Sequence, residues 1–388
     1  MKLIKRSLPF ILILALLLSL SLPALAASER CYRNYKTYMC IGDSIAAGTC
    51  LRRDGTECYF DQENLTLWGV DDDEDIYRGF NFERAPNAYH AIIQESLADV
   101  YGHKVELIQA ARAGMRGVEL RYMLDGTYNE YDKYEMWGNT FWDDNGNGFT
   151  LRDIDNVNAK VDYKSSIKKA DLMTLNIGSN DVFSYSFAEA VGKLTAGSAV
   201  PVFAEIGKYL EATGDLSGAV GKFISAVDTL GLGAIVVGTL VNSLNKSLQQ
   251  FKDNYTAILD WIFKNNPRID VVGVGLYNPL TGVRISEDSA IQLDPIVQPI
   301  LDDINDFIAG FDSKYPGHFF YADTVGTQTY GMNINDNYFS DYFIYKVHPT
   351  LAGHRFMAEK ILDCLPDGEP PIVRVSNTPA DGKILISW

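Results

Sequence analysis

The sequence has no cluster of basic residues and, beyond its N-terminus, no long hydrophobic run. Lysine and arginine number 34 against 50 aspartate and glutamate, a formal net charge of −16 over 388 residues. This balance disfavours a nucleic acid or an anionic membrane surface as a partner held by charge. The most apolar internal stretch, Leu230 to Val241, is too short to span a bilayer. We therefore expect a soluble mature protein without a membrane span.

Cysteine is also scarce, and no two cysteines form a CxxC pair, which argues against a structural zinc site. In an exported protein the cysteines could pair, and the step from Cys50 to Cys58 suits a small loop. The odd count leaves at least one thiol over, and export by an anaerobe could leave all of them reduced. The pairing therefore stays open among Cys31, Cys40, Cys50, Cys58 and Cys364.

The N-terminus has the pattern of a secretory signal peptide. Positive charges on Lys2, Lys5 and Arg6 precede a short apolar run from Phe10 to Leu22, and Ala24-Leu25-Ala26 is a small-x-small cleavage site. An uncleaved anchor is the alternative, but the run is shorter than the roughly 20 residues that a spanning helix needs. We expect residues 1–26 to be removed, which brings the net charge to −19, and the protein to be secreted, into the medium or onto the cell surface.

The composition, with 47% apolar residues and 22% charged residues, is that of a globular protein with ample core. Short apolar runs alternate with amphipathic segments, which predicts a parallel sheet covered on both faces. Apolar residues at helical spacing predict helices over 244–262 and 300–311, and a last helix capped by Thr350 that stops before Pro366. We expect one domain over residues 27–365, a three-layer α/β/α sandwich. Its five parallel strands are predicted at Tyr38 to Ile41, Val105 to Ile108, Leu172 to Ile177, Ile269 to Leu276 and Phe319 to Ala322.

Two insertions interrupt this alternation, and we expect them to form lids or substrate walls. Residues near 120–150 are rich in aromatic side chains, and residues near 184–243 look helical, apolar and glycine-rich. The aromatic members are Tyr122, Tyr128, Tyr131, Tyr134, Trp137, Phe141 and Trp142.

The character of the sequence changes over residues 366–388. After a linker with Pro370-Pro371, two strand-like runs, Ile372 to Val375 and Ile384 to Trp388, flank a turn-rich segment. They resemble the first two strands of a fibronectin type III domain, with Trp388 at the position of its core tryptophan. Two strands cannot bury a sandwich core, so we expect a second domain that is cut off, or else a strand pair docked on the main domain.

Three of the predicted strands end in polar or glycine-containing turns. Gly42-Asp43-Ser44 follows the first strand, Gly114 closes the turn after the second, and Gly178-Ser179-Asn180-Asp181 follows the third. Each segment taken alone also fits an ordinary turn or cap. Together they would place the Ser44 hydroxyl at one edge of the sheet. The Ser44 and Gly114 N–H groups and the Asn180 side-chain amide could hold an oxyanion at the same point.

A histidine-containing segment, Val347-His348-Pro349-Thr350, leads into the last predicted helix. His348 could reach the Ser44 hydroxyl from this loop and act as general base and then general acid; a helix-cap or surface histidine is the alternative. His354 falls inside the helix, where packing or a supporting role suits it better. The remaining histidines have no partner motif and are interpreted as structural: His90, His103 and His318.

These four segments, in this order, resemble the SGNH (GDSL) hydrolase family over roughly residues 36–365. The resemblance implies a flavodoxin-like sandwich without a metal or organic cofactor. It also implies that Ser44 is the nucleophile and His348 the base, and that the Ser44 N–H, Gly114 and Asn180 form the oxyanion hole.

One position departs from the family pattern. The family places an Asp three residues before the catalytic histidine, where this sequence has Tyr345. A Ser-His dyad would still work, with the imidazole held by a backbone carbonyl or by another acid such as Asp341, because the third member orients the imidazole and takes no proton.

Two acidic segments are candidate ion sites. Asp71-Asp72-Asp73-Glu74-Asp75 fits a solvated loop, since adjacent carboxylates repel one another unless a cation joins them. Asp143, Asn145 and Asn147 match three positions of a calcium loop, but the twelfth position is Ile154 where a carboxylate is required. We therefore predict no metal site.

The sequence leads to a secreted, monomeric serine esterase or lipase as the main hypothesis. The apolar insertion favours an acyl-chain site, unless its apolar face is simply core. A carbohydrate deacetylase of the acetylxylan type is the alternative, because aromatic faces stack on sugars and fibronectin-like tails accompany polysaccharide-degrading enzymes. A non-catalytic binding protein on the same fold is a third reading, supported only by Tyr345. The candidate acyl-site residues are Val200, Val202, Phe203, Leu210, Ile224, Ile235, Val236 and Val237.

Overall fold

The computed structural model describes most of the predicted α/β domain and two strands near the C-terminus. The described residues are 32–56, 76–77, 79–126, 160–184, 186, 201–213, 222, 233–284, 292–327, 348–368, 374–377 and 384–387.

The core of the fold is one parallel sheet, in the strand order β2-β1-β3-β4-β5. All four neighbouring pairs run parallel, which confirms the predicted five-stranded parallel sheet. Each predicted strand is present, with ends that differ by one or two residues where they differ. The strands are β1 (Thr37–Gly42), β2 (Glu106–Gln109), β3 (Leu172–Asn176), β4 (Asp270–Val274) and β5 (Phe319–Ala322).

Both faces of the sheet are buried because successive side chains of a strand point to opposite sides. In β1, Tyr38 and Cys40 join one apolar cluster, whereas Met39 and Ile41 join the other. This explains why the strands read as continuous apolar runs and not as an alternation of apolar and polar residues.

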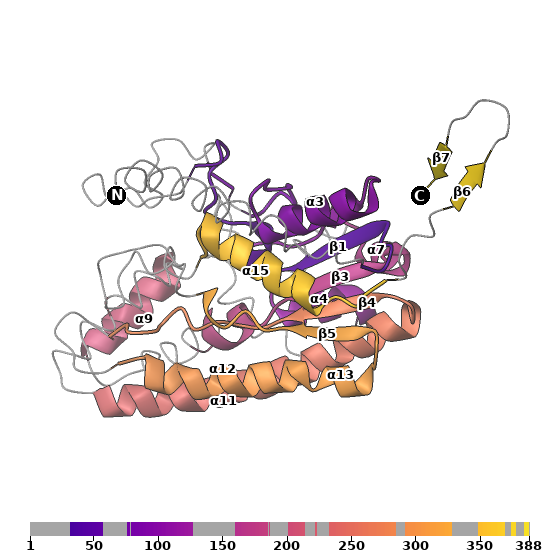
Figure 1. Cartoon of the computed structure of the whole chain (residues 1–388). Coiled ribbons are helices and arrows are strands. Elements are labelled where there is room, and N and C mark those ends of the chain that lie inside the picture. Colours follow the sequence, from indigo (N-terminus) through magenta and orange to yellow (C-terminus); the bar gives the residue numbers. More distant parts are fainter. Residues whose placement is uncertain are drawn as a thin grey trace, which may run out of the picture.

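Helices cover the two faces in separate layers (Figure 1). On one face lie α2 (Ser44–Ala47), α3 (Tyr89–Tyr101) and α15 (Leu351–Cys364). On the other face the core takes side chains from a larger set of helices. They are α4 (Gly117–Asp125), α7 (Tyr163–Lys169), α9 (Pro201–Thr213), α11 (Gly233–Asn265), α12 (Asp294–Ala309) and α13 (Phe311–Lys314).

The predicted helices are present, but their limits differ. The helix expected over 300–311 begins earlier and ends at Ala309 as α12, and Phe311 begins the separate α13. Thr350 caps α15 as expected, and its side chain accepts from the Gly353 N–H at 3.3 Å. The helix expected over 244–262 is the central part of the 33-residue α11, which therefore includes the last residues of the predicted 184–243 insertion. Likewise, the first residues of the 120–150 insertion belong to α4, where Leu120 and Met123 are buried. Most of both insertions lies outside the described residues.

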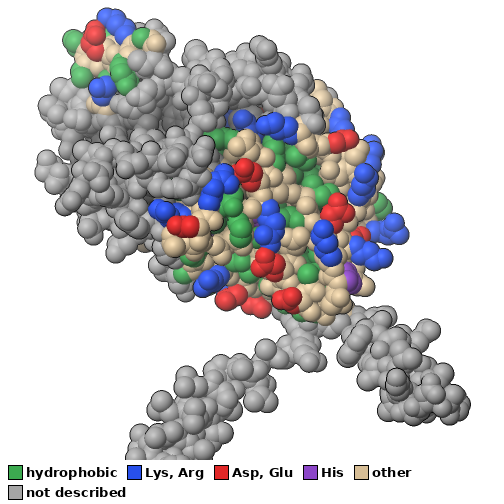
Figure 2. Space-filling model, turned by 90° about the horizontal axis from the view of Figure 1, so that it is seen from above, with side chains coloured by type: hydrophobic (Ala, Val, Ile, Leu, Met, Phe, Trp, Pro, Cys, Tyr) green, Lys and Arg blue, Asp and Glu red, His purple; other side chains and the backbone are tan. Residues whose placement is uncertain are grey.

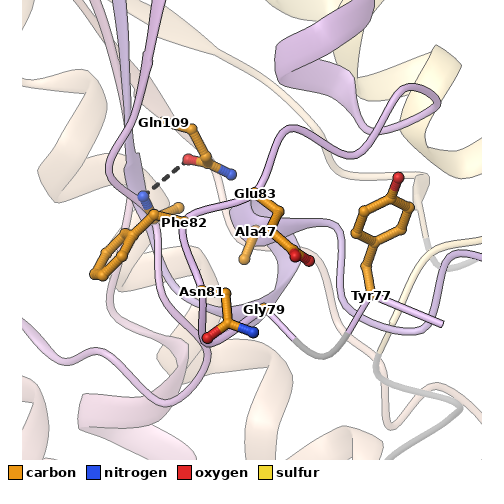
Figure 3. Close-up of a pocket in the computed structure, with 8 residues that line it drawn as sticks. Ala47, Tyr77, Gly79, Asn81, Phe82, Glu83 and Gln109 are labelled. Atoms are coloured by element: carbon orange, nitrogen blue, oxygen red, sulfur yellow. Dashed lines mark hydrogen bonds between the residues drawn. The ribbon is translucent and has the colours of Figure 1, made fainter. Parts of the chain in front are cut away.

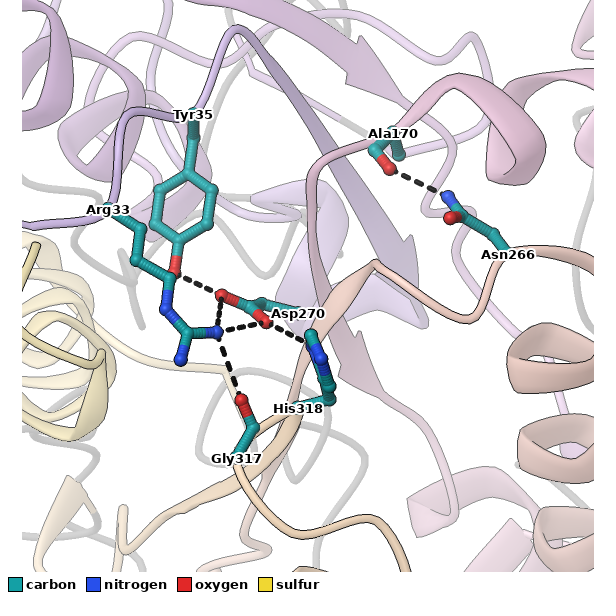
Figure 4. A network of polar contacts seen from close by, with 7 residues as sticks. All are labelled: Arg33, Tyr35, Ala170, Asn266, Asp270, Gly317 and His318. Carbon is teal, nitrogen blue, oxygen red and sulfur yellow. Dashed lines mark hydrogen bonds and ion pairs between the residues drawn. The ribbon is translucent and has the colours of Figure 1, made fainter.

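At the amino edge of the sheet, Asp270 joins three parts of the chain (Figure 4). Its carboxylate is 2% exposed and accepts from Arg33 Nη1 at 2.9 and 3.0 Å, from Tyr35 Oη at 2.6 Å and from His318 Nδ1 at 2.8 Å. Burial and the bond to Asp270 raise the pKa of Tyr35. The network fixes the segment before β1 to the beginnings of β4 and β5, far from the carboxyl edge of the sheet.

The described surface carries both signs of charge. On the face shown in Figure 2, Lys and Arg side chains are interspersed with Asp and Glu. Among the described residues, no helix has the length and apolarity that a membrane crossing requires.

Residues near the C-terminus form an antiparallel pair of β6 (Arg374–Asn377) and β7 (Ile384–Ser387). The second predicted run is thus a strand, whereas the strand at the first run extends two residues beyond Val375, and Ile372 and Val373 lie outside the described residues. Trp388 lies outside the described residues.

Candidate active site

The strand order puts a topological switch point between β1 and β3. The connection from β1 leads to β2 on one side, and the connection from β2 leads to β3 on the other side of β1. Ligands of open α/β sheets bind at such a point, outside the carboxyl ends of the strands. Gly42, the last residue of β1, allows a close approach there. A Cβ at Gly42 would lie 2.4 Å from the carbonyl oxygen of Asn176 in β3, so a larger residue does not fit.

Ser44 is the first residue of α2, directly after this glycine. Asp43 caps the helix, with its side chain accepting from the Ile45 N–H at 3.0 Å. Asp43 is fully buried, and this burial raises the pKa of its carboxyl to about 6. Ser44 keeps partial exposure at the helix N-terminus, a position that suits a nucleophile whose attack generates an oxyanion.

Gly114 lies in the turn after β2 and has a φ of +79°, which favours glycine. The turn is held by a bond from the Met115 N–H to the Arg112 carbonyl at 3.1 Å, and by one from the Ala113 N–H to the Gly79 carbonyl at 2.9 Å. The predicted oxyanion donor therefore lies on a fixed loop.

The segment after β3 ties these two loops together. Ser179 donates through its hydroxyl to the Asp43 carboxylate, and Asn180 donates through Nδ2 to the Met115 carbonyl at 3.2 Å. Asp181 accepts from the Gly117 N–H at 2.8 and 2.9 Å, and burial raises the pKa of its carboxyl to about 7. The loops that carry Ser44, Gly114 and Asn180 are thus joined by hydrogen bonds at one edge of the sheet.

Asn180 also begins η2 (Asn180–Ser184), a short π-helix that packs on α11. Single π-helical turns occur frequently at functional sites. The sequence carries no signal that separates this turn from an ordinary helix start.

His348 is buried, with 3% of its surface exposed, two residues before the Thr350 cap of α15. It therefore lies on the loop that the sequence predicted. Tyr345 and Asp341, which bear on how the imidazole is oriented, lie outside the described residues.

The protein family of this chain follows from a match to a family model. The model described as GDSL-like Lipase/Acylhydrolase matches residues 38–361, which include all four site segments. The chain belongs to this family. It is accordingly a hydrolase that acts on ester bonds.

Solved structures similar to this GDSL-like hydrolase are distant in sequence. The lipase Lip_vut3 from a goat rumen metagenome is 14% identical, with a TM-score of 0.43 over 86% of this chain and 98% of the other. An extracellular lipase from Streptomyces rimosus is 13% identical, with a TM-score of 0.43 over 85% and 100%. A family two carbohydrate esterase from Cellvibrio japonicus is 13% identical, with a TM-score of 0.34 over 84% and 59%. No curated protein sequence matches.

Two further histidines of the GDSL-like hydrolase lie beside the candidate site. His90 and His354 are fully buried, and burial lowers their pKa values to about 4 and about 3. His90 Nδ1 meets the Ala46 carbonyl of α2 at 2.9 Å, and His354 Nδ1 accepts from the N–H of the neighbouring Tyr89 at 3.3 Å. The sequence predicts only a structural role for His90, because no motif marks it.

A small pocket adjoins the site between α2 and the end of β2 (Figure 3). Gln109 is buried in its wall and accepts through Oε1 from the Ala111 N–H at 2.9 Å, while its Nε2 has no hydrogen-bond partner among the described residues. The segment around Gly79 forms the opposite wall, and no sequence motif marks this segment. The pocket is lined by Ala47, Tyr77, Gly79, Asn81, Phe82, Glu83, Gln109 and Ala111.

The metal and cysteine predictions are tested only in part. Within the described residues, no three metal-ligating side chains come together. The acidic run Asp71–Asp75 and the loop with Asp143, Asn145 and Asn147 lie outside them. Cys40 is a free, buried thiol, and burial raises its pKa to about 11. Cys31 and Cys58 lie outside the described residues.

Proposed function

We propose that the protein is a secreted serine esterase or lipase that hydrolyses carboxylic esters through an acyl-enzyme. The observation that carries this proposal is the set of hydrogen bonds joining the loops of Ser44, Gly114 and Asn180 at the switch point of the sheet. These bonds hold a nucleophile and candidate oxyanion donors in fixed relation before substrate arrives, which is the preorganisation that acyl transfer needs.

In the first half of the reaction, His348 takes the proton from the Ser44 hydroxyl as Ser44 Oγ attacks the ester carbonyl carbon. The carbonyl oxygen becomes an oxyanion, which accepts from the Ser44 and Gly114 N–H groups and the Asn180 amide. The carbon–oxygen bond to the alcohol then breaks, and His348 returns the proton to the leaving alkoxide.

In the second half, His348 removes a proton from water, which attacks the acyl-enzyme. The same donors hold the second oxyanion until the bond to Ser44 Oγ breaks. As it breaks, His348 returns the proton to Ser44 Oγ, and the carboxylic acid leaves. His348 acts in a dyad, or with Asp341 as orienting acid, since Tyr345 stands at the position where the family has an Asp.

The acyl-chain hypothesis rests on α9 and its neighbours. Val202 on this helix is 39% exposed, whereas Ile206 is 3% exposed and packs in the core. The two residues are four positions apart and lie on the same side of α9, one turn from each other. The core-facing side of α9 therefore continues, in its first turn, into an exposed apolar residue that is available to an acyl chain.

Hydrolysis of p-nitrophenyl acetate, butyrate and laurate by the full chain without its signal segment tests the proposal. Ser44→Ala should abolish turnover and leave the melting temperature unchanged, while Ser313→Ala on the exposed surface of α13 is the matched control. Rates that rise with chain length support the lipase. A preference for acetate together with release from acetylated xylan supports the deacetylase. Equal rates in Ser44→Ala and the unaltered protein would refute the serine mechanism. No release from any of these esters or from acetylated xylan would favour the binding protein.

We also propose export with cleavage after Ala26, and a hydrolase domain over residues 27–365 followed by the start of a fibronectin type III-like domain. The signal-peptide pattern supports the first, and the antiparallel β6–β7 pair supports the last. N-terminal sequencing of the exported protein should read from Ala27; an intact Met1 would contradict cleavage.

A further inference from the structure

A side chain from α3 binds a carbonyl at the end of the one-turn helix α2, beside a longer contact at 3.8 Å from the Cys40 thiol. The Ser44 and Ile45 carbonyls accept from the Thr49 and Gly48 N–H groups at 3.0 and 3.1 Å. The Ala46 carbonyl instead meets His90 Nδ1 at 2.9 Å. His90 therefore holds the helix that begins with Ser44.

The N-terminus of α3 is in turn bound by a side chain of α15. Tyr89 is the first residue of α3, and the preceding Ala88 offers no side-chain cap. The first N–H groups of a helix have no partner within it. The Tyr89 N–H donates to His354 Nδ1 at 3.3 Å, so α15 supplies the missing acceptor.

These contacts fix opposite tautomers for the two rings. The Ala46 carbonyl can only accept, so His90 carries its proton on Nδ1 and leaves Nε2 bare. The Tyr89 N–H can only donate, so His354 is bare at Nδ1 and carries its proton on Nε2. Neither Nε2 has a hydrogen-bond partner in the part of the chain that the structure describes.

Each histidine supplies a hydrogen bond that an apolar side chain could not. Both rings are fully buried. A leucine would leave no ring nitrogen unpaired, but it would take this partner from the Ala46 carbonyl or from the Tyr89 N–H. The two rings therefore hold these backbone groups in place.

We propose that His90 and His354 are positioning residues that set the spacing between Ser44 and His348. His90 connects α3 to α2 through the Ala46 carbonyl, and the adjacent Tyr89 N–H connects α3 to His354 of α15. The first turn of α15 then leads back from His354 to the Thr350 cap and His348. The inference rests on the proposed function, because it concerns the nucleophile and base of that reaction.

Substitutions that keep or remove single hydrogen bonds test whether these two contacts position Ser44 and His348. His90→Leu and His354→Leu remove the contact at similar volume. His90→Asn keeps a donor for the Ala46 carbonyl, and His354→Asn keeps an acceptor for the Tyr89 N–H, because the Asn amide atoms replace the Nδ1 position. We expect the Leu variants to lower kcat by about 10- to 100-fold with little change in KM, as expected when reacting groups are misplaced by an ångström or less. The Asn variants should recover most of that loss.

The matched control is His103→Leu, which removes a partly exposed ring bonded to Asn34 and should leave kcat unchanged. Thermal unfolding of every variant is measured in parallel. Leu variants with unaltered kcat, or Asn variants no more active than Leu variants at equal stability, would overturn the proposal.

A readout that does not need turnover separates this proposal from the proposed function. Heteronuclear NMR of the isotope-labelled full chain should show His90 as the Nδ1–H tautomer, His354 as the Nε2–H tautomer, and a coupling across the hydrogen bond from Tyr89 to His354. These signals are expected even if no ester is hydrolysed, in which case only the proposed function fails. The same tautomer at both rings, or no coupling, would exclude these two hydrogen bonds as the link between α2 and α15.

Discussion

At the scale of single residues, Asp43 is a carboxyl group that the active-site turn keeps out of water. It is fully buried, and that burial raises its pKa from 3.8 to about 6 although Ser179 and the Ile45 N–H donate to it. A folded state with the higher pKa holds the proton more tightly than the unfolded chain, so this group's contribution is fully present below about pH 4 and is lost as the pH rises through about 6.

Asp43→Asn should therefore stabilise the protein in alkaline solution. The Asn side chain keeps an acceptor for the Ile45 N–H and a donor for the Ser179 hydroxyl, and it carries no charge to bury. The rise in pKa from 3.8 to about 6 corresponds to about 3 kcal/mol, an upper estimate of the gain at about pH 8. At about pH 4 the two proteins should differ little. Urea unfolding across this pH range measures the difference.

The buried histidines supply an opposite dependence that both proteins share. His90 and His354 have folded pKa values of about 4 and about 3, below the ordinary 6.5, so their contribution is lost as the pH falls below about 6.5. The comparison of Asp43→Asn with the unaltered protein cancels this effect. An equal stability difference at both ends of the pH range would contradict the assignment to Asp43.

At the scale of helices and strands, Gly273 allows two helices to pack closely on β4. A Cβ at this position would lie 2.5 Å from Phe319 of β5, 2.7 Å from Ile308 of α12 and 2.9 Å from the Tyr255 hydroxyl of α11. All three neighbours are buried, so none can move into solvent. The sheet and this helix layer are thus fitted to a position without a side chain.

Gly273→Ala should lower the free energy of unfolding by about 2 kcal/mol, because extra volume in a packed core forces its neighbours to shift. Gly310→Ala is the matched control, since its φ is −60° and its Cβ would lie at least 3.4 Å from any neighbour. Denaturant titration of both variants tests this. Equal effects of the two substitutions would show that the packing around β4 is looser than the structure describes.

At the scale of the whole molecule, the carboxyl ends and the amino ends of the strands differ in function. The carboxyl edge carries the loops of Ser44 and Asn180, whereas the amino edge carries the Asp270 network with Arg33 and His318. The first arrangement brings chemical groups together, and the second joins the segment before β1 to β4 and β5.

Asp270→Ala should therefore affect stability far more than catalysis. The substitution leaves the buried Tyr35 hydroxyl without its acceptor, and losing one partner of a buried network costs about 3 kcal/mol. The kcat of the folded variant, measured well below its melting temperature, should match that of the unaltered protein.

Asp303→Ala is the comparison, because it breaks only the exposed pair with Lys252 and should cost less than about 1 kcal/mol. A large loss of kcat in folded Asp270→Ala would mean that the amino edge also shapes the active site.

The sequence by itself determined the sheet and the members of the candidate site. Continuous apolar strands alternating with amphipathic helices identify a parallel sheet, because local periodicity follows directly from which faces are buried. Ser44, Gly114, Asn180 and His348 could be named because each stands where a strand ends or a helix begins, a position that local sequence marks.

Only the tertiary structure decided how these segments are held. The bonds from Ser179 to Asp43 and from Asn180 to Met115 join residues 65 or more positions apart, and His354 meets Tyr89 across 265 positions. No local pattern encodes such pairings, since they depend on which strands become neighbours. His90 shows this most clearly: in sequence it is one histidine in an amphipathic helix, and in the fold it binds the end of the helix that begins with Ser44.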